Sequence, residues 1–250
     1  MMTHSIYMGG TNTEVQMPET FSQFGEDVLV WDYFNRKREG FFVEVGAHSP
    51  RMLSQTWLLE KNGRSGILVE PQSRCCQALR EQRPNARVFQ AACCALEQKG
   101  ALTLHVSNSS DLSSLKKHVN DTDVEYVGAE TVQGLPLDEI LAQAGRPAVD
   151  FISIDVEGLE LDVLRGLDLR KHQPPLLLIE DHLHHLGVHF HLGRHGYKLV
   201  KRTGCNSWYI PRHAPFHIGL WDRIKLFRKV WLGTPLRAFR LKLKKRRQRR

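Results

Sequence analysis

Short apolar runs that alternate with amphipathic stretches constrain the fold of this chain more than any other feature. Five runs have the length and composition of buried strands, and they cover residues 40–47, 65–71, 86–93, 149–158 and 174–182. Stretches with helical spacing lie between them, such as residues 75–84 and 159–167. Strands and helices that alternate in this way build a mostly parallel sheet with helices on both faces. An α/β fold is therefore expected.

Weaker patterns predict the remaining elements. Helices are expected over residues 25–34, 52–63 and 136–145. Residues 100–108 alternate like a strand, and a helix end followed by a strand hairpin is expected over residues 192–202 and 206–212. Residues 109–133 are polar and lack periodicity, which predicts an irregular insertion or a lid near the substrate.

Basic residues are concentrated at the C-terminal end. The net charge is +8, but residues 216–250 hold 13 Lys/Arg and one acid, a charge of +12, which leaves −4 for the rest of the chain. We therefore predict a flexible N-terminal arm (1–20), a globular α/β domain (21–213) and a basic tail (214–250). An anionic partner would be met by the tail.

Targeting signals and cysteines point to the cytoplasm. No apolar run approaches the roughly 20 residues of a membrane-spanning helix. The N-terminal residues lack the basic and apolar regions of a signal peptide. Among five cysteines, the adjacent pairs Cys75-Cys76 and Cys93-Cys94 do not have the spacing of a zinc site. We therefore expect reduced thiols in a cytoplasmic protein.

Polar residues and glycines follow the predicted strands. Because the carboxyl ends of parallel strands meet at one edge of a sheet, these residues should face one crevice. They are Glu44, Gly46, Ala47 and His48 after the first run, Glu70 and Pro71 in the second, Ala91 in the third, Asp155 in the fourth, and Glu180, Asp181 and His182 in the fifth.

Gly46 and Glu70 have the spacing of a nucleoside site. A glycine lets the backbone approach a ligand closely. Glu70 lies 24 residues further on, at the end of the next strand, where one carboxylate accepts hydrogen bonds from both hydroxyls of a ribose. No G-x-G-x-x-G accompanies Gly46, which favours a cofactor without a pyrophosphate over a dinucleotide.

Six segments together resemble the FkbM-type family of methyltransferases. They occur in the family's order and are SQFGEDVLV (22–30), FFVEVGAHSP (41–50), GILVEP (66–71), LPLDEIL (135–141), DFISIDVEGLELDVLRGL (150–167) and LLLIEDH (176–182). The resemblance covers roughly residues 22–210. It implies a Rossmann-like class I methyltransferase fold and S-adenosylmethionine as the cofactor.

The resemblance also implies roles for single residues. Glu44 and Gly46 would lie against the methionine portion of the cofactor, Glu70 against its ribose, and residues 90–92 near its adenine edge. His48 replaces an asparagine that is common in the family. The expected cofactor-binding residues are Glu44, Gly46, Ala47, His48, Glu70, Pro71, Ala91 and Asp155. Family members commonly methylate hydroxyl groups, often on sugars.

Methyl transfer to a hydroxyl requires an aligned acceptor and removal of its proton. Asp155 and His182, each at a strand end that faces the crevice, are the candidate bases. Alternatively, Mg²⁺ held by Asp155, Glu180 and Asp181 would acidify the hydroxyl. Acids at strand ends also cap the helices that follow, and Glu157 is expected to begin such a helix.

Two further groups allow more than one interpretation. Gln23, Glu26 and Asp27 precede the first strand, and they either close over the cofactor or cap the first helix. His185 and His189 have the i, i+4 spacing of a zinc pair. Two glycines are expected to interrupt any helix there, and no glutamate follows the H-E-x-x-H pattern, so a zinc site is not favoured.

The tail carries the second strong pattern. Leu220, Ile224, Phe227 and Trp231 recur at helical spacing, and Pro235 is expected to break the helix. A basic amphipathic helix with aromatic residues is typical of proteins that bind the surface of an anionic membrane. Contact with nucleic acid is less favoured, and packing of the tail on the globular domain is a further alternative.

The sequence thus predicts a cytoplasmic O-methyltransferase, peripheral on the inner membrane face, that acts on a sugar hydroxyl of a glycan or glycolipid. The alternatives are an RNA methyltransferase whose tail holds nucleic acid and a non-catalytic adaptor with the same fold. A homo-oligomer is compatible with each. Acceptor specificity is expected to lie in residues 109–133 and 182–196.

Overall fold

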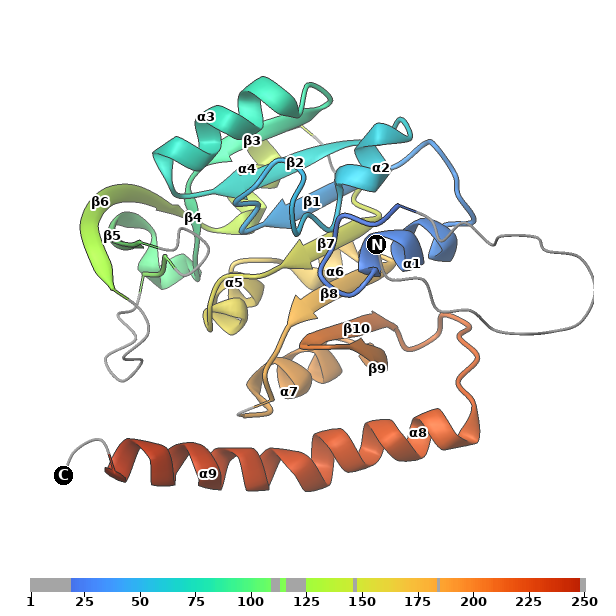
Figure 1. Ribbon diagram of the computed structural model, residues 1–250. Coiled ribbons are helices and arrows are strands. Elements are labelled where there is room, and N and C mark those ends of the chain that lie inside the picture. Colours follow the sequence, from blue (N-terminus) through green and yellow to red (C-terminus); the bar gives the residue numbers. More distant parts are fainter. Residues whose placement is uncertain (1–18, 109–112, 116–124, 146–147, 184, 248–250) are drawn as a thin grey trace, which may run out of the picture.

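A seven-stranded sheet organises the protein (Figure 1). The computed structural model describes residues 19–108, 113–115, 125–145, 148–183 and 185–247, with side chains to residue 240. Most of the predicted arm (1–20) lies outside these residues. The strands of the main sheet are β1 (Phe41–Val45), β2 (Ser65–Glu70), β3 (Ala86–Gln90), β7 (Phe151–Ile154), β8 (Leu176–Glu180), β9 (Tyr197–Thr203) and β10 (Asn206–Pro211).

The strand order is β3-β2-β1-β7-β8-β10-β9. Neighbours from β3 to β8 are parallel, and β10 is antiparallel to both β8 and β9. If only the seven strands of this sheet are numbered along the chain, their spatial order is 3-2-1-4-5-7-6. This order begins like the doubly wound order 3-2-1-4-5. The chain reverses its direction of winding between β1 and β7. Ligands of such sheets bind at this switch point, beyond the carboxyl ends of the strands.

Helices cover both faces of the sheet, as predicted. Val43 and Val45 of β1 pack in a core cluster with residues of α4, α5 and α7. Phe42, on the opposite face of the same strand, packs in a second cluster with residues of α1, α2 and α3. The helices are α1 (Glu26–Tyr33), α2 (Trp57–Lys61), α3 (Ser73–Gln82), α4 (Leu137–Gln143), α5 (Glu160–Arg165), α6 (Leu169–His172) and α7 (Gly187–Arg194).

Two helix predictions need correction. The helix expected over residues 52–63 is limited to α2, because the residues before it form a loop held by side-chain hydrogen bonds. The interruption expected at Gly193 does not occur, whereas α7 begins only at Gly187, so His185 lies outside the helix that contains His189. Val188 and Leu192 are buried against the sheet, and this packing overrides the low helix propensity of glycine.

A small second sheet stands beside the carboxyl end of β3 (Figure 1). It consists of β4 (Ala92–Cys93), β6 (Tyr126–Leu135) and β5 (Gly100–Ser107), in that spatial order. The strand predicted over residues 86–93 is therefore divided between two sheets. Residues 126–133, expected to be irregular, form most of β6 and pair antiparallel with β5. Residues 109–112 and 116–124 of the predicted insertion lie outside the described residues.

The tail is helical and crosses beneath the sheet (Figure 1). It consists of α8 (Leu220–Phe227), a π-helical turn (Arg228–Leu232) and α9 (Gly233–Arg247). The break predicted at Pro235 is wrong. A proline ring clashes with the carbonyl four residues earlier, and here that carbonyl belongs to the wider π-helical turn. No helix within the described ranges is both long and apolar enough to cross a membrane.

Candidate active site

A cavity of about 260 Å³ lies at the switch point of the main sheet. Its wall includes the residues that follow β1, β2 and β7, together with residues of the small sheet. All eight residues predicted to bind the cofactor line it, namely Glu44, Gly46, Ala47, His48, Glu70, Pro71, Ala91 and Asp155. The structure thus brings the whole predicted set together, and their contact with a cofactor stays a prediction.

Gly46 is the position where two strand ends meet. Its φ is +84°, and a Cβ placed there would lie 1.8 Å from the backbone carbonyl oxygen of Asp155. We expected this glycine to admit a ligand, but its nearest neighbour is the end of β7. Only glycine lets the loops after β1 and β7 come this close, and these two loops form part of the cavity wall.

Glu70 is held in place by backbone donors. The N–H of His48 donates to Oε2 over 2.9 Å, and the N–H of Gln72 donates to Oε1 over 2.8 Å. Burial raises the pKa of Glu70 to about 7, and the two backbone hydrogen bonds act against this shift. An ionised carboxylate has about four acceptor positions. Two remain for hydroxyl donors, as the predicted ribose contact requires.

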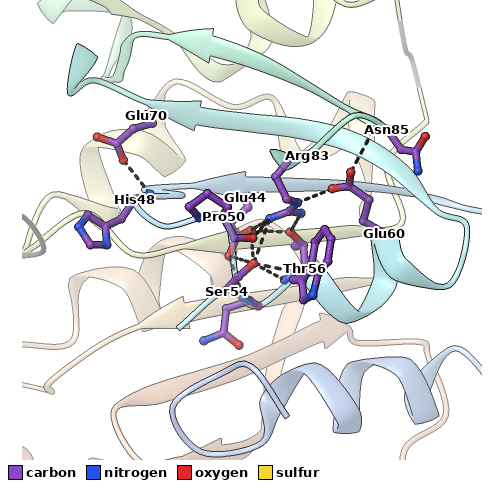
Figure 2. Close-up of polar contacts among 11 residues, drawn as sticks. Glu44, His48, Pro50, Ser54, Thr56, Glu60, Glu70, Arg83 and Asn85 are labelled. Atoms are coloured by element: carbon purple, nitrogen blue, oxygen red, sulfur yellow. Dashed lines mark hydrogen bonds and ion pairs between the residues drawn. The ribbon is translucent and has the colours of Figure 1, made fainter. Parts of the chain in front are cut away.

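Glu44 holds the loop before α2 (Figure 2). Its carboxylate accepts hydrogen bonds from the Ser54 hydroxyl (3.0 Å), the Gln55 N–H (2.7 Å) and the Thr56 hydroxyl. The side chain is almost fully buried. The sequence assigned Glu44 to the methionine portion of the cofactor, whereas its oxygens are engaged by this loop. Glu44 therefore acts on the site by fixing residues 54–56 in the cavity wall.

Arg83, which the sequence analysis missed, completes this network (Figure 2). The fully buried guanidinium donates to the carboxylate of Glu60 and to the hydroxyls of Thr56 (2.9 Å) and Ser54 (3.2 Å). It also lies 3.8 Å from Glu44. We call Glu44, Glu60 and Arg83 the arginine clamp. Two buried carboxylates share one cation, which offsets the cost of removing them from water.

Three other carboxylates meet at the cavity wall, within electrostatic range of Glu44. One oxygen each of Asp155, Glu157 and Glu180 lies within 4.8 Å of the others. We call these residues the acid cluster. Burial, and then the neighbouring Glu180 carboxylate, raise the pKa of Asp155 well above its usual range. Asp155 and Glu180 are hydrogen-bonded to each other, so one proton is shared between them.

Asp181, predicted to join Asp155 and Glu180 around a metal ion, lies elsewhere. It follows Glu180 directly, and neighbouring residues of an extended chain point to opposite sides. Its Oδ1 accepts the backbone N–H of Leu183 over 2.7 Å. Glu157, which the sequence assigned to the start of a helix, takes its place in the cluster. The alternation along β8 is a sequence signal that could have excluded Asp181.

The other candidates lie around the cavity. His182 is exposed, with Nε2 3.6 Å from Oε1 of Glu180, and does not line the cavity. Gln23 does line it. Glu26 instead accepts hydrogen bonds from Asn206 and Thr203 at 2.8 Å each, which tie α1 to the hairpin of β9 and β10. Asp27 accepts the Ser22 hydroxyl and the Phe21 N–H and so fixes the turn before α1, but it does not cap the helix.

Several residues of the cavity wall carry no sequence signal. Met52, Leu53, Leu104 and Leu115 give it an apolar part. Gln55 contributes a buried Oε1 that has no hydrogen-bond partner among the described residues. An unpaired buried acceptor is costly in a folded protein. This atom therefore marks a place where a ligand with a donor group would fit.

The sheet topology and a cavity at the switch point define a Rossmann-like fold of the type found in S-adenosylmethionine-dependent methyltransferases. The family model "Methyltransferase FkbM domain" matches residues 44–199, which is more than half of the chain. The chain belongs to this family. No curated protein matches its sequence.

Solved structures share the general arrangement at low sequence identity. The precorrin-6y C5,15-methyltransferase from Geobacter metallireducens is 10% identical, with 80% of this chain and 93% of that chain covered and a TM-score of 0.42. A methyltransferase from Geobacter sulfurreducens is 12% identical (78% and 82% covered, TM-score 0.44). The N-terminal domain of human METTL16 is 12% identical (80% and 74% covered, TM-score 0.44). These likenesses are too distant to carry an argument about substrate.

Proposed function

We propose that this protein transfers a methyl group from S-adenosylmethionine to a hydroxyl, most plainly a sugar hydroxyl of a glycan or glycolipid. The observation that carries the proposal is the acid cluster in the cavity wall. A hydroxyl is a weak nucleophile until its proton is removed, and Asp155 is a carboxylate with a raised pKa beside the predicted cofactor residues. The membership of the FkbM family supports the cofactor.

The cavity fits the cofactor on three grounds. Glu70 keeps two acceptor positions for the ribose hydroxyls. Gln55 offers an unpaired buried acceptor for an amino group. Pro71 and Ala91 supply apolar surface for a base. When bound, S-adenosylmethionine supplies a methyl group on a sulfonium centre.

The residues of the chain then have distinct tasks. Glu70 orients the nucleoside, and the arginine clamp keeps residues 54–56 in position. Asp155, in its ionised form, accepts the proton of the acceptor hydroxyl as the oxygen attacks. Glu180 holds Asp155 and keeps its pKa raised, so that the carboxylate is a stronger base than an exposed aspartate.

A divalent cation is the alternative way to activate the hydroxyl. The donor set of Asp155, Glu157 and Glu180 consists of carboxylate oxygens, which suit Mg²⁺. These residues would hold the ion, and the ion would lower the pKa of the hydroxyl. Turnover that persists in excess chelator favours Asp155 acting alone. Turnover that is lost in chelator and restored by Mg²⁺ favours the ion.

The proposal is tested in two steps. Calorimetry with purified protein should show S-adenosylmethionine binding that Glu70→Ala abolishes or strongly weakens. Mass spectrometry of cell-envelope glycans should then show a species heavier by one CH₂ group only when the gene is present. Absence of cofactor binding, with Glu70→Ala unchanged from wild type, would end the proposal. Methylation of RNA instead of glycans would reassign the acceptor.

A further inference from the structure

The helical tail packs on the globular domain along one side. Val230 and Thr234 are buried there. Lys229 Nζ donates to the carbonyl of Gly204 (3.3 Å), and Arg237 Nε donates to the carbonyl of Leu183 (3.2 Å). The tail is therefore docked through a few residues and leaves its other faces open.

The open side of the tail is strongly apolar. Trp221 and Leu220 are 74% and 69% exposed. The large apolar side chains exposed along the tail are Leu220, Trp221, Ile224, Phe227, Trp231, Leu232, Leu236 and Phe239. Of these, Trp231 also packs edge-on against His189 and Phe190 of α7. We call this set the apolar face. Contiguous exposed apolar surface on a protein marks interaction sites.

A groove of about 690 Å³ lies between the tail and the domain, beside the apolar face. Phe227 and Trp231 belong to both. The rest of the apolar lining includes Phe216, Ile218 and Leu226. The groove is thus continuous with the exposed apolar surface.

Three cations line the same groove, and no described residue of its lining is acidic. Lys198 donates to the carbonyl of Ala214 (2.8 Å), and Arg212 donates to the carbonyl of Gly193 (3.1 Å). Arg223 is exposed on α8. None of the three forms an ion pair with a residue that the structure describes. The groove therefore combines an apolar floor with uncompensated positive charge.

We propose that the groove and the apolar face together bind anionic phospholipid, and so seat the protein on a bilayer. The phosphate would lie against Lys198, Arg212 and Arg223, and an acyl chain would enter along the apolar floor. Tryptophans such as Trp221 and Trp231 suit the boundary between headgroups and chains. Nucleic acid would use the cations but would leave the eight exposed apolar side chains in water.

The docked tail runs between the two edges of the main sheet, and the groove lies at the amino edge, where Lys198 is at the start of β9 and Arg212 follows β10. Leu183 and Gly204, to which the tail is attached, follow β8 and β9 at the edge where the cavity opens. Figure 1 shows the C-terminal end of α9 on the side to which β1, β7 and β8 point. A bilayer along the tail would therefore reach the cavity side of the sheet through α9, whereas the groove lies at the opposite edge. In this respect the inference rests on the proposed function, because it brings a membrane-bound acceptor to the site.

Vesicle sedimentation of the full chain tests the inference. The protein should pellet with phosphatidylcholine vesicles that contain phosphatidylglycerol and should stay in solution with phosphatidylcholine alone. Trp221→Glu with Ile224→Glu should weaken binding at least about tenfold. Lys198→Gln with Arg223→Gln should weaken it about fivefold for each cation removed. Arg74→Gln with Arg80→Gln, on the distant helix α3, is the matched control and should bind within about twofold of wild type.

Cofactor binding, measured by calorimetry on the same proteins, separates this inference from the proposed function. The inference is supported if the groove variant and the apolar-face variant both lose vesicle binding and both keep the cofactor affinity of the wild type. Failure of the wild type to pellet, or variants that bind like the control, would overturn the inference. The inference would also be overturned if the protein bound an RNA duplex in a salt-sensitive way and did not bind vesicles. Release of the protein from vesicles by inorganic phosphate at constant ionic strength would overturn it as well. Vesicle binding without any cofactor binding would instead count against the proposed function.

Discussion

The arginine clamp and the acid cluster are two groups of carboxylates at one cavity, to whose wall the clamp contributes Glu44, and they are built in opposite ways. In the clamp, Glu44 and Glu60 are buried around the guanidinium of Arg83, and the loop saturates the Glu44 oxygens. In the acid cluster, Asp155 and Glu180 lie side by side, and neither forms an ion pair with a lysine or arginine of the described chain.

The difference separates structural from chemical roles. Burial raises the pKa of Glu44 as it raises that of Asp155, but in the clamp the Arg83 cation and three hydrogen bonds act against the shift. Two carboxylates held together without a cation keep a shared proton at a pH where an exposed acid has lost it. The clamp therefore holds the loop that forms part of the cavity wall, and the acid cluster has the electrostatic environment of a proton acceptor.

Removal of the proton acceptor should have the largest effect. Asp155→Asn keeps the shape of the side chain but cannot take the hydroxyl proton, so kcat should fall by about 10²–10⁴. Single-turnover methyl transfer at saturating cofactor measures this. Glu139→Gln, an acid on α4 outside the cavity, should leave kcat unchanged. Equal rates for Asp155→Asn and wild type would exclude Asp155 as the base.

Disruption of the clamp should lower stability. Arg83→Ala leaves two buried carboxylates without their cation, so the free energy of unfolding should drop by about 3–5 kcal/mol. Urea unfolding of the exposed matched variant Arg80→Ala should differ from wild type by less than about 0.5 kcal/mol. If the two variants were equally stable, the clamp would not support the fold.

Glu70 should make cofactor binding depend on pH. Its pKa is raised to about 7, and the protonated form is a poor acceptor for two hydroxyls. Affinity for S-adenosylmethionine should therefore be full above pH 7 and fall by up to about tenfold for each pH unit below it. Glu70→Gln has no charge to lose and should flatten the profile. A flat wild-type profile from calorimetry would remove Glu70 from the ribose site.

The smallest effect is expected at Glu180. Its charge and its hydrogen bond both raise the pKa of Asp155. Glu180→Gln removes the charge, so Asp155 should ionise at lower pH and the acidic limb of the pH–kcat profile should move to lower pH. A limb that stays in place, or moves to higher pH, would show that Asp155 and Glu180 do not share their proton in solution.

The centre of the main sheet could be predicted because β1, β7 and β8 are buried on both faces and are therefore largely apolar. β6 could not. Val132 and Gly134 are its buried residues, and the rest of the strand is exposed or half-buried, so its sequence has no regular apolar alternation. Pro235 misled the helix prediction because its effect depends on the π-helical turn before it. The position of each strand end followed from sequence, but the pairing of exposed segments did not.

The candidate site could likewise be predicted where its residues lie at strand ends, and not elsewhere. Glu70 and Asp155 lie at strand ends, and strand ends of a parallel sheet meet by topology alone. Arg83 lies far from Glu44 in sequence, on the loop after α3, so no local pattern links it to the cavity. Glu157 takes the place predicted for Asp181 in the acid cluster because of the directions in which these side chains point. Strand alternation predicts that direction along β8, but no such rule applies to the loop after β7.

The π-helical turn at Arg228–Leu232 makes the tail sensitive to length as well as composition. Each residue of an α-helix advances the side chains by about 100°. A five-residue π-helical turn advances the side chains about as far as four residues of α-helix, so deletion of one residue that returned this turn to α-helix would leave Leu236 and Phe239 in nearly the same direction relative to Trp221. Conversion of the turn to α-helix without a deletion would instead rotate them by roughly 90° about the helix axis, although every residue type remained. Relatives that share this tail should therefore either keep the π-helical turn or lack one residue between residues 227 and 233.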